Sequence, residues 1–441
     1  MRPLPTLVLV LALTPIAIAD DWPQWMGPGR DAVWAETGII DRLPPEGPKV
    51  LWRTAVGGGY AGPAVARGKV YLSDYVKSAG DDMPNPVKRS ELQGNERVSC
   101  FDAANGELLW SHTYDCPYTI SYPAGPRCTP TVHDGKVYTL GAMGNLFCLD
   151  AAKGTVLWSK DFTKDYSVEA PLWGFCGHPL IHGGRLICIV GGDGTTAVAF
   201  DKNTGKELWR SLSSKQTGYS APTLIQAGGV PQLLIWHGEA LNAINPETGN
   251  LYWSFPLAPQ MGMAIMVPRK DGDYLFAGAV YGTAVGLKLA ADTPAASLAW
   301  RGPTNMKDTG LFPMNMTPFA EGGVLYGVDQ PGQFRAVKID TGERLWESWE
   351  PVTGETKSRP VYTATVFVVK NGDRFFLFNE KGELLIAKLS PTSYEELGRW
   401  KLLEPTGTAF GRDVVWSHPA FANRCIYCRN DKELICVSLA K

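Results

Sequence analysis

Short apolar stretches bounded by turn-forming residues recur along the whole chain. Residues 136–140 read Lys-Val-Tyr-Thr-Leu, and β-branched and aromatic residues of this kind favour strands. Tight turns are predicted at 133–136 and 143–145, and again where Gly154 follows Asp150 by four residues. No stretch of ordinary helix length shows a 3.6-residue period. The pattern predicts units of four short strands joined by turns.

A tryptophan closes each unit. In several units a glycine stands four residues before it, and an Asp or Asn four residues before that glycine. The intervals between successive tryptophans after Trp110 run from 44 to 54 residues, which is the length of one four-stranded propeller blade. The first interval is 58 residues because 76–97 is inserted there, and we expect this insertion to be a surface loop. The repeat tryptophans are Trp52, Trp110, Trp158, Trp209, Trp253, Trp300, Trp346 and Trp400.

The two ends of the chain carry incomplete units. Residues 416–437 begin a unit that has no tryptophan strand, and 50–53 form a tryptophan strand with nothing before it. Together they would complete one blade and leave no open sheet edge. We therefore expect an all-β fold: an eight-bladed β-propeller with four-stranded blades over 49–441, closed by the N-terminal strand pairing with the C-terminal blade. A periodic aromatic of this size is expected to pack between neighbouring blades.

The amino terminus has the features of an export signal. A basic residue precedes an apolar run, and small residues stand at 17 and 19, so we expect a signal peptide over 1–19 with cleavage after Ala19. Residues 20–48 are expected to be an extension that packs on the propeller. No later stretch is long enough for a membrane span, and no cysteine precedes Cys100 to carry a lipid anchor. A periplasmic or secreted monomer is expected.

Charge and cysteine usage narrow the classes of partner. The net charge is −2, which argues against nucleic acid as a partner. Nine cysteines are present; several occupy repeat positions typical of small core residues, while Cys116 and Cys128 flank a loop and could form a disulfide. Cys425 and Cys428 have CxxC spacing, but alternate sides of a strand would separate them, so no metal site is expected there.

Two further motifs are poor guides to chemistry. Residues 57–62 match G-x-G-x-x-G literally, but a strand rather than a helix follows them, so no dinucleotide site is expected. His178 and His182 have the spacing of a helical zinc site, but Pro179 makes the segment extended. We expect no metal ligand and no catalytic residue from these motifs.

A small or polar residue before proline opens several units, at the start of the expected innermost strand. By analogy with other propellers, we expect these positions to face the central channel, where propellers usually bind ligands or partners. Equally, the same side chains could plug the channel and bond to one another. The candidate ligand- or partner-binding residues are Tyr122, Arg127, Trp173, His178, Arg412, Trp416 and His418.

The repeat, in the forms 148–158 (CLDAAKGTVLW) and 199–209 (AFDKNTGKELW), resembles the pyrroloquinoline-quinone-enzyme repeat. The resemblance covers nearly the whole mature chain. It implies a propeller, and two kinds of protein share it: quinoprotein alcohol and glucose dehydrogenases, which use the quinone with calcium, and the propeller subunit of the outer-membrane β-barrel assembly machinery. The chain lacks the adjacent cysteine pair of many such dehydrogenases and any calcium or aspartate motif that can be carried over.

From the sequence we expect a non-catalytic binding or scaffold protein at the cell envelope, with a protein or other envelope component as partner and no cofactor. The first alternative is an oxidoreductase that depends on pyrroloquinoline quinone with calcium. The second is a propeller that binds carbohydrate or peptide, which the aromatic residues near the channel mouth permit.

Overall fold

The computed structural model describes residues 20–303, 305 and 309–441; the expected signal peptide lies outside the described residues. Strands dominate the described part of the chain. Its helical segments are single turns: α1 (Phe162–Asp165), α2 (Glu350–Thr353) and the 3-10 turn η1 (Gln260–Gly262). None of the described helices has the length and hydrophobicity needed to cross a membrane. The all-β prediction is therefore confirmed.

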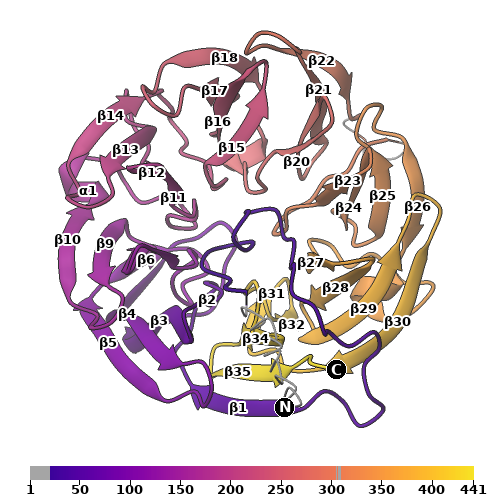
Figure 1. Ribbon diagram of the computed structural model, residues 1–441. Helices are drawn as coiled ribbons and strands as arrows, with labels where there is room; N and C mark the ends of the chain where they lie inside the picture. Colours follow the sequence, from indigo (N-terminus) through magenta and orange to yellow (C-terminus); the bar gives the residue numbers. More distant parts are fainter. Residues whose placement is uncertain (1–19, 304, 306–308) are drawn as a thin grey trace, which may run out of the picture.

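Within the described residues, eight antiparallel sheets have at least four strands each, and Figure 1 shows them arranged around a common centre. Seven of the sheets use consecutive segments, with the first strand innermost. Three of these are β2 (Ala64–Ala66), β3 (Lys69–Gly80), β4 (Ser90–Asp102) and β5 (Leu108–Asp115); β7 (Thr131–His133), β8 (Lys136–Leu140), β9 (Asn145–Asp150) and β10 (Val156–Asp161); and β11 (Leu180–His182), β12 (Arg185–Ile189), β13 (Ala197–Asp201) and β14 (Glu207–Ser211).

The other four consecutive sheets follow the same plan. They are β15 (Thr223–Ala227), β16 (Val230–Trp236), β17 (Ala240–Ile244) and β18 (Leu251–Pro256); β19 (Arg269–Asp271), β20 (Tyr274–Ala279), β21 (Thr283–Leu289) and β22 (Ala296–Arg301); β23 (Phe319–Glu321), β24 (Val324–Val328), β25 (Phe334–Lys338) and β26 (Arg344–Ser348); and β27 (Val366–Asn371), β28 (Arg374–Asn379), β29 (Glu383–Leu389) and β30 (Tyr394–Lys401).

The remaining four-stranded sheet contains both ends of the chain. β1 (Val50–Ala55) pairs antiparallel with β35 (Glu433–Ser438), which continues to β34 (Cys425–Arg429) and β33 (Ala420–Ala422). Trp52 lies opposite Cys436 in this register. A separate hairpin, β31 (Gly407–Ala409) and β32 (Arg412–Val414), stands between β30 and β33. Ladder hydrogen bonds thus join the two ends of the chain.

Five of the repeat tryptophans each meet a glycine of the next sheet: Trp52, Trp110, Trp158, Trp209 and Trp300. Gly154 has φ +70, and a Cβ on it would lie 2.4 Å from the Trp110 ring. The Trp110 indole N–H donates to Ala151 O over 3.2 Å. Trp52, Trp158, Trp209, Trp300 and Trp346 donate in the same way, to Ala103, Lys202, Pro246, Ile339 and Ser390 respectively. The glycine is therefore needed both for its backbone conformation and for the space it leaves.

Two tryptophans depart from this arrangement. The Trp253 N–H donates to Gln232 Oε1 within its own sheet. Trp400 is 37% exposed and packs against Gly47 of the amino-terminal extension. The expectation that every indole packs between neighbouring sheets is therefore wrong for Trp400, whereas Trp253 still packs against an apolar cluster that joins residues of β16, β17, β20 and β21. At Trp400 the extension takes the place of a following sheet.

The insertion at 76–97 is mostly paired strand, so the expectation of a surface loop is wrong for most of its length. β3 and β4 continue through it, and only 81–89 connects them. β6 (Tyr118–Ile120) pairs with the outer end of β4. Leu92 is buried there, and Tyr75 stacks on Tyr118 with ring centroids 4.1 Å apart. The third strand gives this hairpin a buried face, which stabilises it.

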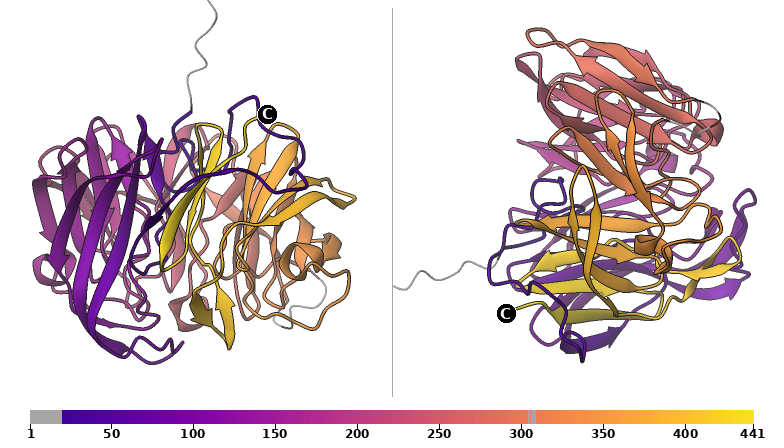
Figure 2. Two further views of the ribbon diagram at one scale, coloured as in Figure 1. Left: turned by 90° about the horizontal axis from the view of Figure 1, so that it is seen from below. Right: turned by 90° about the vertical axis from the view of Figure 1, so that its right-hand side faces the viewer.

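The segment 21–40 forms an arm across one face. Its backbone bonds to β2 at Val65, to β27 at Lys370 and to Leu439 after β35. Trp22, Trp25 and Trp34 are buried. Figure 2 shows the arm on one face, whereas the β3–β4 extension and the β31–β32 hairpin project from the opposite face.

The nine cysteines are free thiols. The Cys116 thiol points to Asn145 Oδ1 and the Cys128 thiol to Phe175 O, each over 3.7 Å. The disulfide considered between them is therefore absent, because each thiol faces a different acceptor. Cys425 and Cys428 lie on β34 and are buried.

Replacing Gly154 by alanine tests the contact between tryptophan and glycine. The new Cβ would strain the φ +70 backbone and collide with Trp110, so we expect a loss of about 2–4 kcal/mol in unfolding free energy. Gly135→Ala is the matched control, since Gly135 has φ +72 and nothing within 4 Å of a Cβ. Urea unfolding should show at most about half that loss for the control. Equal losses in the two variants would mean that the indole contact adds nothing.

Candidate functional site

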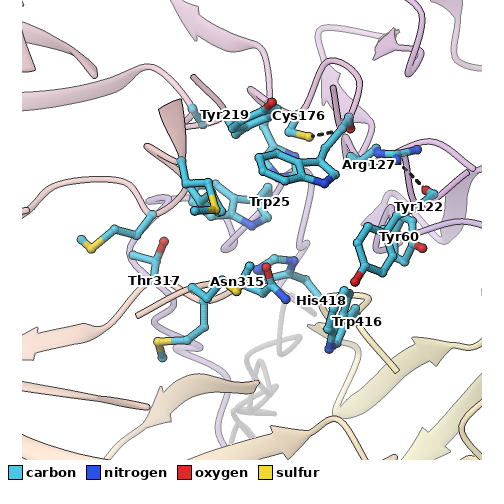
Figure 3. A pocket seen from close by; sticks show the side chains of 18 of the residues that line it. Trp25, Tyr60, Tyr122, Arg127, Cys176, Tyr219, Asn315, Thr317, Trp416 and His418 are labelled. Atoms are coloured by element: carbon cyan, nitrogen blue, oxygen red, sulfur yellow. Dashed lines mark hydrogen bonds between the residues drawn. The ribbon is translucent and has the colours of Figure 1, made fainter. Parts of the chain in front are cut away.

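A cavity of about 180 Å³ lies at the centre, between the arm and the opposite face. Its walls are the loops before the inner strands, together with one residue each from the arm, the β3–β4 connection and the β31–β32 turn. The lining residues are Trp25, Tyr60, Pro86, Tyr122, Arg127, Trp173, Cys176, His178, Tyr219, Ala221, Met263, Ile265, Met266, Met314, Asn315, Met316, Thr317, Phe410, Trp416 and His418. Figure 3 shows them converging on one space.

Trp25 of the arm closes the cavity on one side. Its ring stacks on His178, with centroids 4.6 Å apart and 8° between the planes, and meets the edge of His418 at 5.7 Å. The Arg30 guanidinium also lies over the Trp25 ring, 5.4 Å from its centroid. Arg30 also donates to His178 O and Pro179 O at the start of β11. The arm is thus anchored on the residues that open the inner strands.

Both histidines are held in the neutral form. Burial lowers the pKa of His418 to about 3. Burial also lowers the pKa of His178 well below its ordinary value, and the nearby His418 and Arg30 add to the effect. The Thr129 N–H donates to His178 Nδ1 over 3.0 Å, which leaves the proton of the neutral ring on Nε2. Neither ring therefore carries charge near neutral pH.

Aromatic rings form the mouth of the cavity. On one side Tyr122 and Phe410 meet Trp416 with centroids 5.7 and 6.2 Å apart, and Tyr60 lies 6.3 Å from the same ring. On the other side Trp173 lies 5.2 Å from Tyr219. Rings at such distances form a stable apolar wall. The mouth is therefore shaped for an apolar group rather than a hydrated one.

Arg127 is the one arginine among the lining residues. It donates to the carbonyls of Ser121 and Tyr122 over 2.9 and 2.6 Å, and also to Gly125 O. Its guanidinium lies over the Tyr60 ring, 5.1 Å from the centroid. Arg127 therefore holds the loop 121–125 in place while its charge stays beside the cavity.

Arg412 lies outside the lining of the cavity. It donates from Nε to Glu380 Oε1 over 2.7 Å, and its guanidinium lies over Phe410. The Trp416 indole N–H also reaches Glu380, at 3.3 Å. Arg412 thus fixes the β31–β32 hairpin that supplies Phe410. The structure brings the other six candidates to the cavity: Tyr122, Arg127, Trp173, His178, Trp416 and His418.

Sequence reasoning missed several lining residues. Met263 and Met266 precede β19, and Met314 and Met316 precede β23. Met266 and Met316 stand one position before the place that His178 and His418 occupy in their units, so the repeat alignment held a usable signal. Trp25 carried no such signal, because its place depends on the path of the arm across the face.

Replacing His418 by glutamine, which does not titrate, should make the unfolding free energy less dependent on pH. Below about pH 6.5 the unfolded chain takes up a proton at this residue, whereas the folded chain does so only near pH 3. Stability therefore falls as the pH drops through this window. At pH 4.5 we expect the wild type to have lost about 2 kcal/mol more than His418→Gln, measured by urea unfolding. His133→Gln, on the exposed His133 (41% of the side chain), should follow the wild type; parallel curves for all three proteins would refute the assignment.

Comparison with known proteins gives one family and a set of similar folds. No curated protein matches the sequence. The structure is similar to BamB from Moraxella catarrhalis, with 15% identity, a TM-score of 0.53 and coverage of 82% of this chain and 99% of the other. It is also similar to quinohemoprotein alcohol dehydrogenases from Comamonas testosteroni and Pseudomonas putida, each with 13% identity, a TM-score of 0.59 and coverage of 95% of this chain and 80% of theirs.

At such identities these structures establish the propeller-type fold alone. The sequence itself matches a family profile twice, over 94–285 and 237–441, which together span most of the chain. The expected resemblance to the pyrroloquinoline-quinone-type repeat is thereby confirmed. The chain belongs to the family described as outer membrane protein assembly factor BamB.

Proposed function

We propose that this protein is an exported, non-catalytic propeller of eight blades, closed by β1, which acts as a binding scaffold at the cell envelope. The observation that supports this most is the chemistry of the cavity. Apolar and aromatic side chains dominate its walls, and its two histidines are neutral and packed against rings. Such a site favours holding a group over transferring protons to it. The partner is a protein or another envelope component.

The cavity and its surroundings suit a docking role. The β3–β4 extension and the β31–β32 hairpin flank the mouth and add a second hollow, of about 630 Å³, which shares Tyr60 with the first. Figure 2 shows both hairpins projecting beyond the sheets on that face. A partner bound there would meet two raised edges and a deep apolar centre. Rigid sheets beneath would hold this surface in one shape.

Capture of the partner in the host cell tests this proposal. Trp173→Ala combined with Trp416→Ala should reduce cross-linked partner at least tenfold, because both rings line the mouth. Trp400→Ala is the control, since this indole is 37% exposed on the outermost strand of its sheet. Circular dichroism would verify that each variant is folded. Undiminished capture by the folded double variant would refute the site.

The quinone-dependent alternative needs a different set of donors. Calcium takes six to eight oxygen ligands, and the lining holds no carboxylate. Within the described residues no group of three His, Cys, Asp or Glu side chains could hold a metal ion. The quinone carries three carboxylates, whereas Arg127 is the sole charged lining residue at neutral pH. The residues present therefore do not fit the quinone with calcium.

Addition of the quinone decides this alternative. With saturating pyrroloquinoline quinone and Ca²⁺ we expect the melting temperature to stay unchanged and no dye-linked oxidation of alcohols. A ligand that bound the folded state at 100 times its Kd would stabilise it by about 2.7 kcal/mol. A saturable rise in melting temperature would restore the oxidoreductase hypothesis. Ca²⁺ alone is the control.

A further inference from the structure

The cavity has an unbalanced charge. Arg127 is its single cation and no Asp or Glu lines it, although the protein as a whole has a net charge of −2. No ion pair involving Arg127 occurs among the described residues, since its donors meet backbone carbonyls. A guanidinium keeps its charge at any physiological pH. The local field therefore favours an anion even though the net charge does not.

The buried carboxyl of Glu96 makes its hydrogen bonds to groups other than Arg127. Glu96 accepts hydrogen bonds from the hydroxyls of Tyr114 and Tyr118 and from the Ala142 N–H. Burial raises the pKa of Glu96 above its ordinary value, while these three donors and the charge of Arg127 act in the opposite direction. Its oxygens are occupied by these donors, so they are not available to Arg127. Among the described residues, Arg127 therefore forms no direct ion pair with a carboxylate.

The lining also contains polar hydrogens without an acceptor. The Trp25 Nε1–H and the Asn315 Nδ2 group are buried and have no partner among the described residues. Both residues line the cavity, and Figure 3 shows the Asn315 side chain on the side of the cavity across from Arg127. A buried donor without an acceptor loses its hydrogen bonds to water and gains nothing in return. The unsatisfied groups are donors, so an occupant should supply acceptor oxygens.

The rest of the cavity suits an apolar body. Trp173 and Tyr219 form one wall, and Tyr122 and Trp416 form another. Methionine side chains of the loops before β19 and β23 also line it. Methionine is flexible and polarisable, so such a surface adapts to aromatic or branched apolar groups. The walls therefore set size and hydrophobicity rather than a detailed hydrogen-bonding pattern.

Building on the proposed function, we propose that the cavity binds an apolar or aromatic group that bears one carboxylate. The carboxylate lies beside Arg127, and the apolar part lies between the two aromatic walls. Two sources carry this chemistry: a free apolar carboxylic acid, and the carboxy-terminal residue of a polypeptide that ends in an apolar side chain. A charge-assisted contact between the carboxylate and the remaining donors of the guanidinium would give the site its specificity.

Matched probes separate charge from hydrophobicity in the wild-type protein. N-acetylphenylalanine and its primary amide differ in the carboxylate alone, and intrinsic tryptophan fluorescence or calorimetry would give each Kd. We expect the acid to bind at least tenfold more tightly than the amide, with the preference weakened by 0.5 M NaCl. Equal affinities, or no binding of either probe at 10 mM, would overturn the proposal. This arm needs no substitution and so does not depend on the folding of a variant.

Substitutions then locate the carboxylate. Arg127→Gln should bring acid and amide to within twofold of each other, whereas Arg127→Lys should retain part of the preference. Arg210→Gln is the control, because Arg210 is exposed on an outermost strand and pairs with Glu207, so it removes the same charge elsewhere. An unchanged preference in folded Arg127→Gln would overturn the assignment.

Probes of different length distinguish the two sources of the carboxylate. A pentapeptide ending in phenylalanine, tested as the free acid and as the amide, should bind at least tenfold more tightly than N-acetylphenylalanine if the occupant is a polypeptide end. A free acid is indicated if the peptide binds more weakly. Partner capture lost in the Trp173→Ala and Trp416→Ala double variant, together with indifference to the carboxylate, would refute this inference and leave the scaffold function intact.

Discussion

The contact between a tryptophan of one sheet and a glycine of the next governs this fold. The indole ring leaves no room for a Cβ, and its N–H satisfies a carbonyl in the turn that the glycine closes. One side chain thus contributes packing, a hydrogen bond and a fixed spacing between sheets. The tryptophan of each such unit packs on the following unit, and its glycine receives the tryptophan of the preceding one. A single unit therefore cannot form these contacts by itself, and its stability depends on its neighbours.

That dependence explains how the cavity is built. Because each sheet is fixed against the next, the loops before the inner strands are brought to one place regardless of their sequences. These loops can then vary, from Cys176 and His178 in one unit to Met263 and Met266 in another, without disturbing the frame. The loop residues determine what the cavity can bind, while the tryptophan contacts fix the arrangement of the sheets. Family membership therefore says more about the frame than about what occupies its centre.

The repeat made much of this predictable. Spacing of tryptophans and glycines gave the sheets, and proline after His178 and His418 pointed to the inner strands and so to the cavity. Arg412 was a candidate because it lies near Trp416 in the sequence. Its ion pair with Glu380 holds the side chain outside the lining of the cavity. Trp25 could not be foreseen, because non-repeating residues take their position from the tertiary path. The insertion was misjudged because its third strand, β6, comes from beyond Trp110.

The arm that crosses the face has a consequence for the order of assembly. Its partners include Val65 near the beginning of the chain and Leu439 near its end, with Pro179 and Lys370 between them. The arm precedes all eight of these sheets in the sequence, yet its full set of neighbours exists only once the final strands are in place. Val65 can pair with it early, whereas Trp34, which packs against Phe376 and Phe421, can be buried only after the last sheets have formed. Complete packing of the arm is therefore a late step of folding.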